Sequence, residues 1–516
     1  MSVTSKASPE RAERQPAPAR LRTGTLGTAD IAFFVVSAAA PLTVMAGVAP
    51  IAIVLGGIGA PVGYLIAGIT LTVFAVGFTT MSRHVRSGGA FYAYITQGLG
   101  KPIGIGAALL AVVGYNGMEI GVYGLLGSAT ADTAHALWGV DIPWLPIALV
   151  GLVLIWYGGY RSIDFGAKVL GVLLVAETGI LVLLAGGVLL KGGADGLSLA
   201  SLAPDNFLVP GTAAVLAFAF AAFTGFESTV IYRREARDPG RTVPRATYIA
   251  VCFLGVFYAF IVWAVIQAFG DAQVVKAAAD DPGGLFFAAI TTYVGAWAAD
   301  LMHIFIVTSI LASLLAFHNA INRYSLALAE EGVLPAALAK VHPRHGSPYL
   351  AGAAQTVLGL IVVLAFALAG ADPYTQLLLW VNTPGSIGLL ALQLLAALAI
   401  PFYFRRVRHS EGVVRTVVAP VTAAVLLTAA IALVVSKIDL FTGASPTVNT
   451  VLVAVVPGVF LLGLLIALRL RRSRPEVYAR FAAEPAESRE SPESAEPAES
   501  EPAERAQPAQ SAEPVA

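Results

Sequence analysis

The chain alternates long apolar segments with short polar ones from about residue 30 onward. About twelve segments of roughly twenty residues are apolar enough to cross a hydrocarbon core of roughly 30 Å as helices. We expect these spans at residues 30–54, 57–81, 103–130, 143–159, 166–190, 207–231, 246–269, 297–326, 349–370, 375–403, 416–436 and 448–468. Because backbone in lipid must satisfy its own hydrogen bonds, the pattern predicts an all-α integral membrane protein with a transmembrane core at 26–470.

The first span is interrupted near its middle. Its sequence, FFVVSAAAPLTVMAGVAP, contains Ser37, three alanines and Pro41. Pro41 has no N–H, and its ring crowds the carbonyl of Ser37, so polar backbone groups are freed inside an apolar segment. Such backbone persists at membrane depth where it lines a polar cavity, as in transporters. The alternative interpretation is a proline kink without a functional role.

A second candidate interruption lies in the sixth span. There Thr224, Gly225 and Phe226 precede Glu227 in the middle of the segment FTGFES. A carboxyl group beside a glycine at this depth strengthens the case for a break. Interrupted helices in corresponding halves of a membrane protein suggest inverted repeats around a binding site near the midplane.

Two further spans carry isolated carboxyl groups. Glu119 shares a helix face with Tyr115, Asn116 and Tyr123. A carboxyl group near the bilayer centre is costly, so a functional role is the default, with a hydrogen-bonded structural glutamate as the alternative. Glu177 has only aliphatic neighbours, which favours its protonated form and makes it a candidate proton carrier.

Several smaller features of the sequence contribute less to the functional interpretation. Gly117 and Gly121, four residues apart, are typical of close helix packing. Trp380 in the tenth span is a candidate substrate contact, with packing as the alternative. The histidines lack a companion at metal-ligand spacing, so we expect neither a metal site nor a cofactor. The single cysteine, Cys252, excludes an intramolecular disulfide.

Composition and charge define the class and the orientation. Hydrophobic residues make up 57% of the chain and charged residues 12%, which excludes a soluble globular protein. Of the 32 Lys and Arg residues, 29 fall on one side of the predicted spans. We therefore expect a multi-pass protein of the plasma membrane with both termini cytoplasmic. This bias explains the basic loops without a nucleic-acid partner.

The two ends of the chain read as disordered tails. Residues 1–25 are rich in Pro, Ala and Arg. Residues 471–516 are rich in Pro, Glu, Ala and Ser, and the part from 475 onward holds ten Glu against three Arg. Such segments cannot bury enough apolar surface to offset their ordering entropy.

Four stretches carry a family resemblance. They are SAAAPL, SGGAFYAYITQGLG, FTGFES with EARDPGRTVPRA, and NAINRYSLALAEEGVLP. Together they resemble the amino acid permease family of the amino acid-polyamine-organocation (APC) superfamily, over nearly all of residues 25–470. The resemblance implies five plus five helices in an inverted repeat, with discontinuous helices 1 and 6, and two extra helices.

The resemblance also implies a substrate site. Backbone groups of the first break would hold a substrate carboxylate, and carbonyls of both breaks its amino group. The corresponding residues are Ser37, Ala38, Ala39 and Ala40 in the first break and Thr224, Gly225 and Phe226 in the second. Glu227 matches a glutamate linked to pH response in the arginine/agmatine antiporter.

Two departures from the family pattern bear on mechanism. Ala38, Ala39 and Ala40 replace a common Gly-Ser-Gly strip. Glu177 stands where proton-coupled cationic amino acid members carry Lys, so the coupling mechanism stays open.

We therefore expect a secondary transporter of amino acids or related amines, driven by protons or working by exchange, and not an enzyme. Glu119, Glu177 and Glu227 would bind protons or a cationic substrate. The alternatives are a polyamine or organic cation exchanger of the same fold and a transport-inactive membrane sensor. An integral-membrane enzyme would require clustered catalytic residues, which the sequence does not contain.

Overall fold

A computed structural model describes residues 26–85, 90–161, 167–234 and 236–482, which are helical apart from turns and one isolated bridge between Leu26 and Ala236. Within them, eleven helical segments are long and apolar enough to cross a membrane. The sequence predicts about twelve. The predicted span at 143–159 falls on α7 (Trp144–Tyr160), an apolar helix of only 17 residues. The predicted tail at 1–25 lies outside the described residues.

Prolines divide the first part of the chain into short helices. Pro41, Pro50 and Pro61 each lie in the first two positions of a helix, where a missing N–H costs nothing. The span at 30–54, predicted to break near Pro41, therefore forms three helices, with a second division between Gly47 and Ala49. The helices are α1 (Thr28–Ala38), α2 (Pro41–Gly47), α3 (Ala49–Gly56), the short 3-10 helix η1 (Gly57–Gly59) and α4 (Ala60–His84).

The next helices are arranged around α6 (Lys101–Trp138), which has 38 residues. It packs against α7, α5 (Ala90–Leu99), α14 (Ala296–Glu330), α16 (Leu379–Phe404) and α19 (Pro446–Ser473). Its glycines allow this packing. A methyl group on Gly117 would lie 2.8 Å from the Val381 oxygen, and one on Gly124 2.3 Å from the Pro373 oxygen. A methyl group on Gly121 would lie 3.0 Å from the Leu378 oxygen, so the predicted close packing at Gly117 and Gly121 is confirmed. α5 precedes α6 in the sequence, and α8 (Ala167–Lys191) follows α7.

The middle of the chain contains the second interruption and the helices that surround it. Their bounds are η2 (Ala200–Leu202), α9 (Pro204–Phe207), α10 (Pro210–Ala222), the 3-10 helix η3 (Phe226–Arg234), α11 (Pro239–Phe269), α12 (Val274–Asp280), α13 (Leu285–Tyr293) and α14 (Ala296–Glu330). The predicted spans at 207–231, 246–269 and 297–326 lie on α10 with η3, on α11 and on α14.

The last part of the chain forms four long helices and their connections. Their bounds are η4 (Ala336–Ala339), α15 (Tyr349–Leu368), the π-helical turn η5 (Pro373–Leu378), α16 (Leu379–Phe404), the π-helical turn η6 (Val414–Val418), α17 (Ala419–Ser436), α18 (Ile438–Thr442), α19 (Pro446–Ser473) and α20 (Pro475–Arg480). The described helices thus extend into the range predicted as the C-terminal tail, and residues 483–516 lie outside them.

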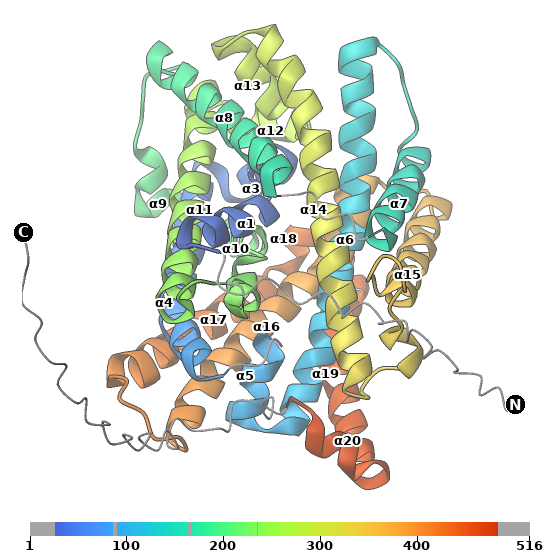
Figure 1. Cartoon of the computed structure of the whole chain (residues 1–516). Helices are drawn as coiled ribbons and strands as arrows, with labels where there is room; N and C mark the ends of the chain where they lie inside the picture. The colour runs from blue at the N-terminus through green and yellow to red at the C-terminus, as the bar shows by residue number, and fades with distance from the viewer. Residues whose placement is uncertain (1–25, 86–89, 162–166, 235, 483–516) are drawn as a thin grey trace, which may run out of the picture. The chain divides into compact units, whose positions relative to one another are not determined.

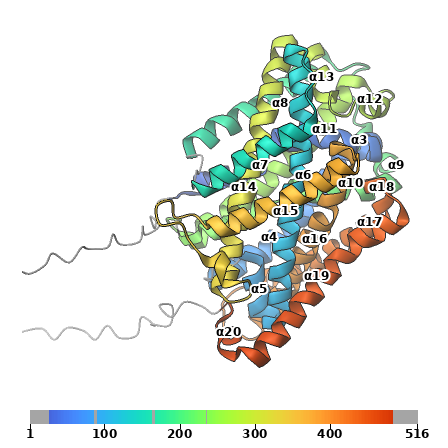
Figure 2. The ribbon, with the colours of Figure 1, turned by 90° about the vertical axis from the view of Figure 1, so that its right-hand side faces the viewer.

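The interrupted segments occupy the interior of the bundle. α1 packs against α11 and α8, α2 against α8 and α14, and α10 against α4 and α3 (Figures 1 and 2). The segment formed by α10 and the start of η3 has 83% of its most apolar stretch buried inside the protein. The corresponding share for α19 is 17%. Thus α10 belongs to the core, and α19 presents most of its apolar surface outward.

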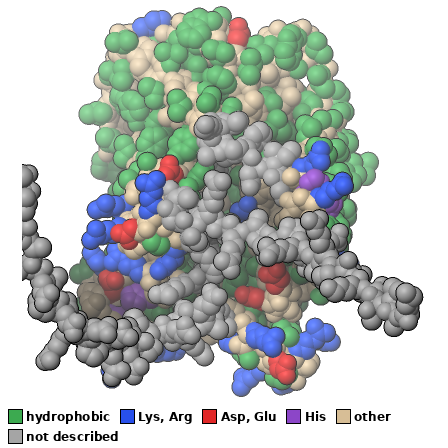
Figure 3. All heavy atoms as spheres, in the orientation of Figure 1, with side chains coloured by type: hydrophobic (Ala, Val, Ile, Leu, Met, Phe, Trp, Pro, Cys, Tyr) green, Lys and Arg blue, Asp and Glu red, His purple; other side chains and the backbone are tan. Residues whose placement is uncertain are grey.

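The surface separates apolar from charged side chains. In Figure 3, hydrophobic side chains cover the upper part of the visible face, whereas Lys and Arg gather in the lower part. α5 and α20 lie at this lower end in Figure 1. An outward apolar surface of this kind suits contact with lipid chains.

Candidate functional site

The first interruption lies between α1 and α2. α1 ends at Ala38, and Ala40 has φ 46° and ψ 71°, a left-handed conformation that alanine rarely adopts. Pro41 then begins α2. The Ser37 hydroxyl donates to the Phe33 carbonyl at 2.9 Å, so this side chain is bound to its own helix. The Tyr258 hydroxyl donates to the Ala39 carbonyl at 3.4 Å.

The second interruption lies between α10 and η3. α10 ends at Ala222, and Gly225 has φ 106°, which only glycine adopts without strain. The Gly225 amide donates to Glu227 Oε2 at 3.0 Å, and the Ser228 hydroxyl donates to the Gly225 carbonyl at 2.6 Å. The ring of Phe226 is fully buried. The glutamate side chain therefore satisfies backbone that the helix leaves free.

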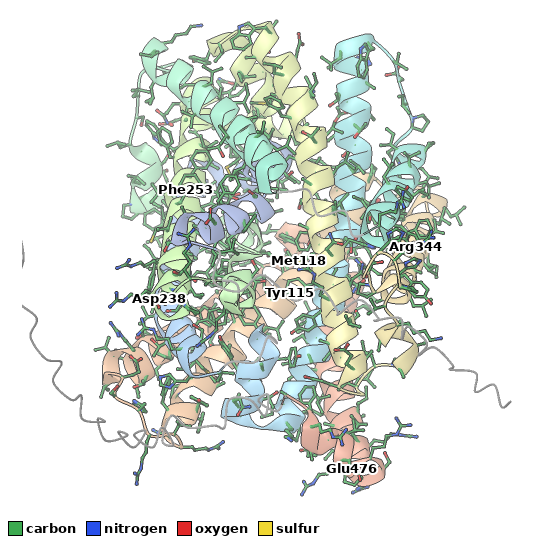
Figure 4. All side chains as sticks on the ribbon, viewed as in Figure 1. Tyr115, Met118, Asp238, Phe253, Arg344 and Glu476 are labelled. Carbon is green, nitrogen blue, oxygen red and sulfur yellow. The ribbon has the colours of Figure 1, made fainter. Side chains whose placement is uncertain are left out.

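One cavity touches both interruptions. Its volume is about 80 Å³, and Ala39 of the first interruption and Thr224 of the second line it. The cavity lies beside α6, where Tyr115 and Met118 are seen in Figure 4. Other lining residues come from α2, α6, α10, α14, α16 and α18: Thr43, Val44, Met118, Val122, Leu125, Phe218, Ala221, Ala222, Ser313, Phe317, Leu379, Asn382, Ser386 and Phe441.

A larger cleft lies elsewhere. It has a volume of about 740 Å³ and is open, with α6, α13 and α14 among its walls. Its ionisable lining residues are Asp132, His135, Asp141, Asp281, Asp300 and His303. Neither helix interruption contributes to this cleft. We therefore take the smaller cavity, which both interruptions line, as the candidate site.

Glu227 lies directly behind the second interruption. It is 5% exposed, and the Tyr115 hydroxyl donates a hydrogen bond to its Oε1. Together with the Gly225 amide, Tyr115 gives this carboxyl group two donors. Tyr115 thus reaches the second interruption from α6. The structure brings these predicted residues together, and their functional roles stay predictions.

Glu177 lies behind the first interruption. Its Oε2 accepts a hydrogen bond from the Ser309 hydroxyl at 2.8 Å, and the backbone amide of Leu42 also interacts with the carboxyl group. The Thr43 hydroxyl donates to the Ser309 oxygen at 2.7 Å. A continuous set of polar contacts therefore joins α8, α14 and the first turn of α2.

Glu119 faces away from the cavity into a separate buried polar cluster. Its Oε1 lies 3.3 Å from His318 Nδ1 and accepts from the Tyr123 hydroxyl at 3.3 Å. The Gln355 amide donates to its Oε2. His318 and Glu119 are 1% and 2% exposed, so the pair is fully desolvated. Neither His318 nor Gln355 is a predicted site residue, and no local spacing could have paired them with Glu119.

The remaining predicted residues are scattered. Asn116 donates to the Val112 carbonyl of its own helix at 2.7 Å. Trp380 donates from Nε1 to the Thr442 carbonyl at 2.9 Å, its ring packs against Phe366, and it does not line the cavity. Ala38 is the last residue of α1. Within the described residues, no group of three His, Cys, Asp or Glu could hold a metal ion.

Comparisons with known proteins point in one direction. The sequence model "Amino acid permease" matches residues 30–476. An uncharacterized transporter of Mycobacterium tuberculosis is 27% identical over 328 residues, 63% of this chain and 70% of that protein. The branched-chain amino acid permease BcaP of Bacillus subtilis is 25% identical over 158 residues, 30% and 33% of the two chains. The histidine permease HisP of Lactococcus lactis is 24% identical over 320 residues, which are 59% of this chain and 65% of that protein.

Proposed function

This chain belongs to the amino acid permease family, a family of multi-pass membrane transporters and not of enzymes, and on that premise we propose that it carries amino acids or related amines across the plasma membrane. It works as a secondary transporter by alternating access. The relatives named for branched-chain amino acids and for histidine are consistent with an amino acid substrate. Both termini lie in the cytoplasm, as the placement of 29 of the 32 basic residues suggests.

The observation that carries the proposal is the shared cavity. Ala39 and Thr224, 185 positions apart, both line it, and each lies at the end of a helix. Helix ends expose carbonyls or amides without an intrahelical partner, and these bind charged groups. A zwitterionic amino acid needs both kinds of group within a few ångströms. Discontinuous helices 1 and 6 in a five-plus-five inverted repeat would supply them.

Coupling to protons is the finer part of the proposal. Glu227 and Glu177 each lie beside one interruption, so their charge state affects the helix ends that face the substrate. A proton on either group removes a negative charge from the site. Glu119 belongs to the separate polar cluster and has His318 as its ionisable partner.

Proteoliposome uptake tests the function and its coupling. The full chain is reconstituted, and uptake of labelled amino acids is measured with and without a pH gradient and with and without substrate inside. We expect uptake that depends on the gradient or on the internal substrate. Uptake indifferent to both would contradict the coupling. If amino acids bind in a thermal-shift assay but are not taken up, the transport-inactive sensor is favoured. If only polyamines are taken up, the cation exchanger is favoured.

The variant Glu227→Gln tests the role of this carboxyl group. Glutamine keeps the shape and can still accept from Tyr115, but it cannot bind a proton. We therefore expect a flatter dependence of the uptake rate on pH. The matched variant is Tyr115→Phe, which removes the hydrogen bond and keeps the carboxyl group, so its uptake should still vary with pH. An unchanged profile in Glu227→Gln would remove this residue from the mechanism.

A further inference from the structure

The chemistry of the cavity wall restricts the substrate. No Asp, Glu, Lys, Arg or His is among the described residues that line it. Its polar lining side chains are neutral: Thr43, Thr224, Ser313, Asn382 and Ser386. The rest of the wall is aliphatic or aromatic, as in most small-molecule sites. A charged substrate side chain would find no counter-charge there.

The three buried carboxyl groups do not change this conclusion. Glu227 is bound by Tyr115, Glu177 by Ser309, and Glu119 by the cluster around His318. None of the three lines the cavity. Moving the ionised ammonium or guanidinium group of a substrate side chain into an apolar pocket without a paired partner is strongly unfavourable.

The size of the cavity restricts the substrate further. An apolar cavity of about 150 Å³ takes up benzene, whereas this cavity has about 80 Å³. The rings of Phe218, Phe317 and Phe441 form part of its wall. Little room is left for a branched, aromatic or imidazole side chain.

Two buried polar atoms of α16 mark where a ligand would form hydrogen bonds. The Asn382 Oδ1 and Ser386 Oγ atoms are buried and have no hydrogen-bond partner in the described structure. Both residues line the cavity, four positions apart on one helix face. A buried polar group without a partner is costly, so a substrate that satisfies these atoms is favoured.

We propose that the substrates are small neutral amino acids, of the size of glycine, alanine and serine, with Asn382 and Ser386 as specificity-determining residues. This inference rests on the proposed transport of amino acids. The apolar wall excludes cationic side chains, the three phenylalanines exclude large ones, and the two unpartnered atoms bind a hydroxyl group.

Competition measurements test this substrate class. Uptake of labelled serine and alanine into proteoliposomes is measured against an excess of each unlabelled amino acid. We expect glycine, alanine and serine to compete, and arginine, lysine and tryptophan to leave uptake unchanged. Equal competition by arginine or tryptophan, or transport of those amino acids alone, would overturn the inference and leave the proposed function standing. Absence of any amino acid uptake would overturn the proposed function itself.

Two variants test which residues of the cavity wall determine the substrate selectivity. Ser386→Ala should lower the ratio of serine to alanine uptake about tenfold, because one hydrogen bond is lost. Phe317→Ala removes a ring from the wall and should admit leucine. The matched control is Phe253→Ala on α11, a ring that is 37% exposed and lies away from the cavity (Figure 4). An unchanged serine ratio in Ser386→Ala together with no leucine uptake in Phe317→Ala would contradict these assignments.

A different set of contacts supports a second inference. After α19 the chain turns back, and Phe481 and Ala482 are 1% and 3% exposed. Lys101 Nζ donates to the Tyr478 carbonyl at 3.0 Å, and Gln97 Nε2 donates to the Ala482 carbonyl at 3.1 Å. Residues 475–482, the C-terminal clasp, are thus bound to α5 and to the start of α6.

A series of aromatic rings leads from the clasp to the second interruption. Ring centroids lie 5.7 Å apart for Phe481 and Tyr92, 5.3 Å for Tyr92 and Tyr324, and 6.3 Å for Tyr324 and Tyr115. The hydroxyl of Tyr115 then reaches Glu227. The rings come from α5, α14 and α6, so they fill the space between these helices.

We infer that the clasp is the outermost layer of a plug that closes this end of the bundle. Releasing Phe481 would uncover Tyr92 and begin to open a path toward Glu227.

Cysteine labelling tests the plug in the full chain. Cys252, the only cysteine, is replaced by serine, and Ser228 by cysteine, so that a maleimide reports access to the second interruption. We expect Phe481→Ala to raise the labelling rate at least severalfold and Phe481→Leu to leave it nearly unchanged. The control Phe253→Ala should match the parent. Equal labelling rates in Phe481→Ala and the parent would overturn the plug.

Discussion

Ala40 stores backbone strain at the first interruption. Its left-handed conformation costs an alanine about 1 kcal/mol more than a glycine. We therefore expect Ala40→Gly to raise the free energy of unfolding by about 1 kcal/mol, and Ala40→Val to lower it, because a β-branched side chain tolerates this conformation worse. Thermal unfolding of the purified protein in detergent measures both. A lower Tm for Ala40→Gly than for the parent would contradict the strain.

Glu119 and His318 form a desolvated pair whose energetics can be separated. Removing one partner of a buried hydrogen-bonded pair leaves the other polar group without that bond, which costs about 1–3 kcal/mol. We expect His318→Gln to destabilise the protein by about this amount, and the double variant with Glu119→Gln by much less than the sum of the single variants. The free energies of unfolding of the parent, the two single variants and the double variant complete this double-mutant cycle. Additive losses would show that the two groups do not interact.

At the scale of elements, glycines set the distance between α6 and the π-helical turn η5, which leads into α16. Gly124→Ala would place a methyl group 2.3 Å from the Pro373 oxygen, so the two helices must separate. The expected loss is about 2 kcal/mol of unfolding free energy. Gly186→Ala on α8 is the control, because no atom lies within 4 Å of the added methyl group, and it should be neutral or slightly stabilising. Equal effects of the two substitutions would argue against close packing.

An ionisable group, Glu331, lies where the clasp meets the end of α14. Burial raises the pKa of Glu331 to about 7, and the nearby Glu330 adds to this, whereas the Ala482 amide and the Tyr92 hydroxyl act against it. Tyr324 is the other titratable group that faces it. A raised pKa means that the docked clasp favours protonated Glu331, so docking is strongest at low pH and weakens as the pH rises through about 7.

We therefore expect Ser228→Cys in the Cys252→Ser background to be labelled faster, relative to a fully exposed control cysteine, as the pH rises from 6 to 8. These two values lie about one unit on either side of the pKa of Glu331. The variant Glu331→Gln keeps the contact without the charge, and its relative labelling rate should be low and constant. A pH dependence that survives in Glu331→Gln would assign it to another group.

At the scale of the whole molecule, the sequence predicts the helices better than their contacts. The apolar segments and the positions of Pro41 and Gly225 could be read directly, because proline and glycine act on their own backbone. The partners of Glu119 could not, since His318 and Gln355 lie 199 and 236 positions away. The same holds for Ser309 and Glu177, 132 positions apart. Such pairs depend on how helices pack, which no local pattern encodes.

The C-terminal clasp shows a second limit of sequence reasoning. Composition predicts a disordered acidic tail over residues 471–516, because the Glu- and Pro-rich repeats dominate that range. Phe481 is the last aromatic residue before them, and its burial depends on the surface that α5 presents through Tyr92. One residue in such a context gives no periodic signal.

The unequal lengths of the helices have a consequence for the surrounding lipid. α6 has 38 residues and is about 57 Å long, so even a strong tilt leaves its ends outside a hydrocarbon core of about 30 Å. α7 has 17 residues, reaches only about 26 Å, and exposes Val150, Val153 and Leu154. The hydrocarbon core is thicker than α7 is long, and this hydrophobic mismatch grows with acyl-chain length. Uptake should therefore slow in bilayers of longer lipids, which would make membrane thickness a determinant of the transport rate.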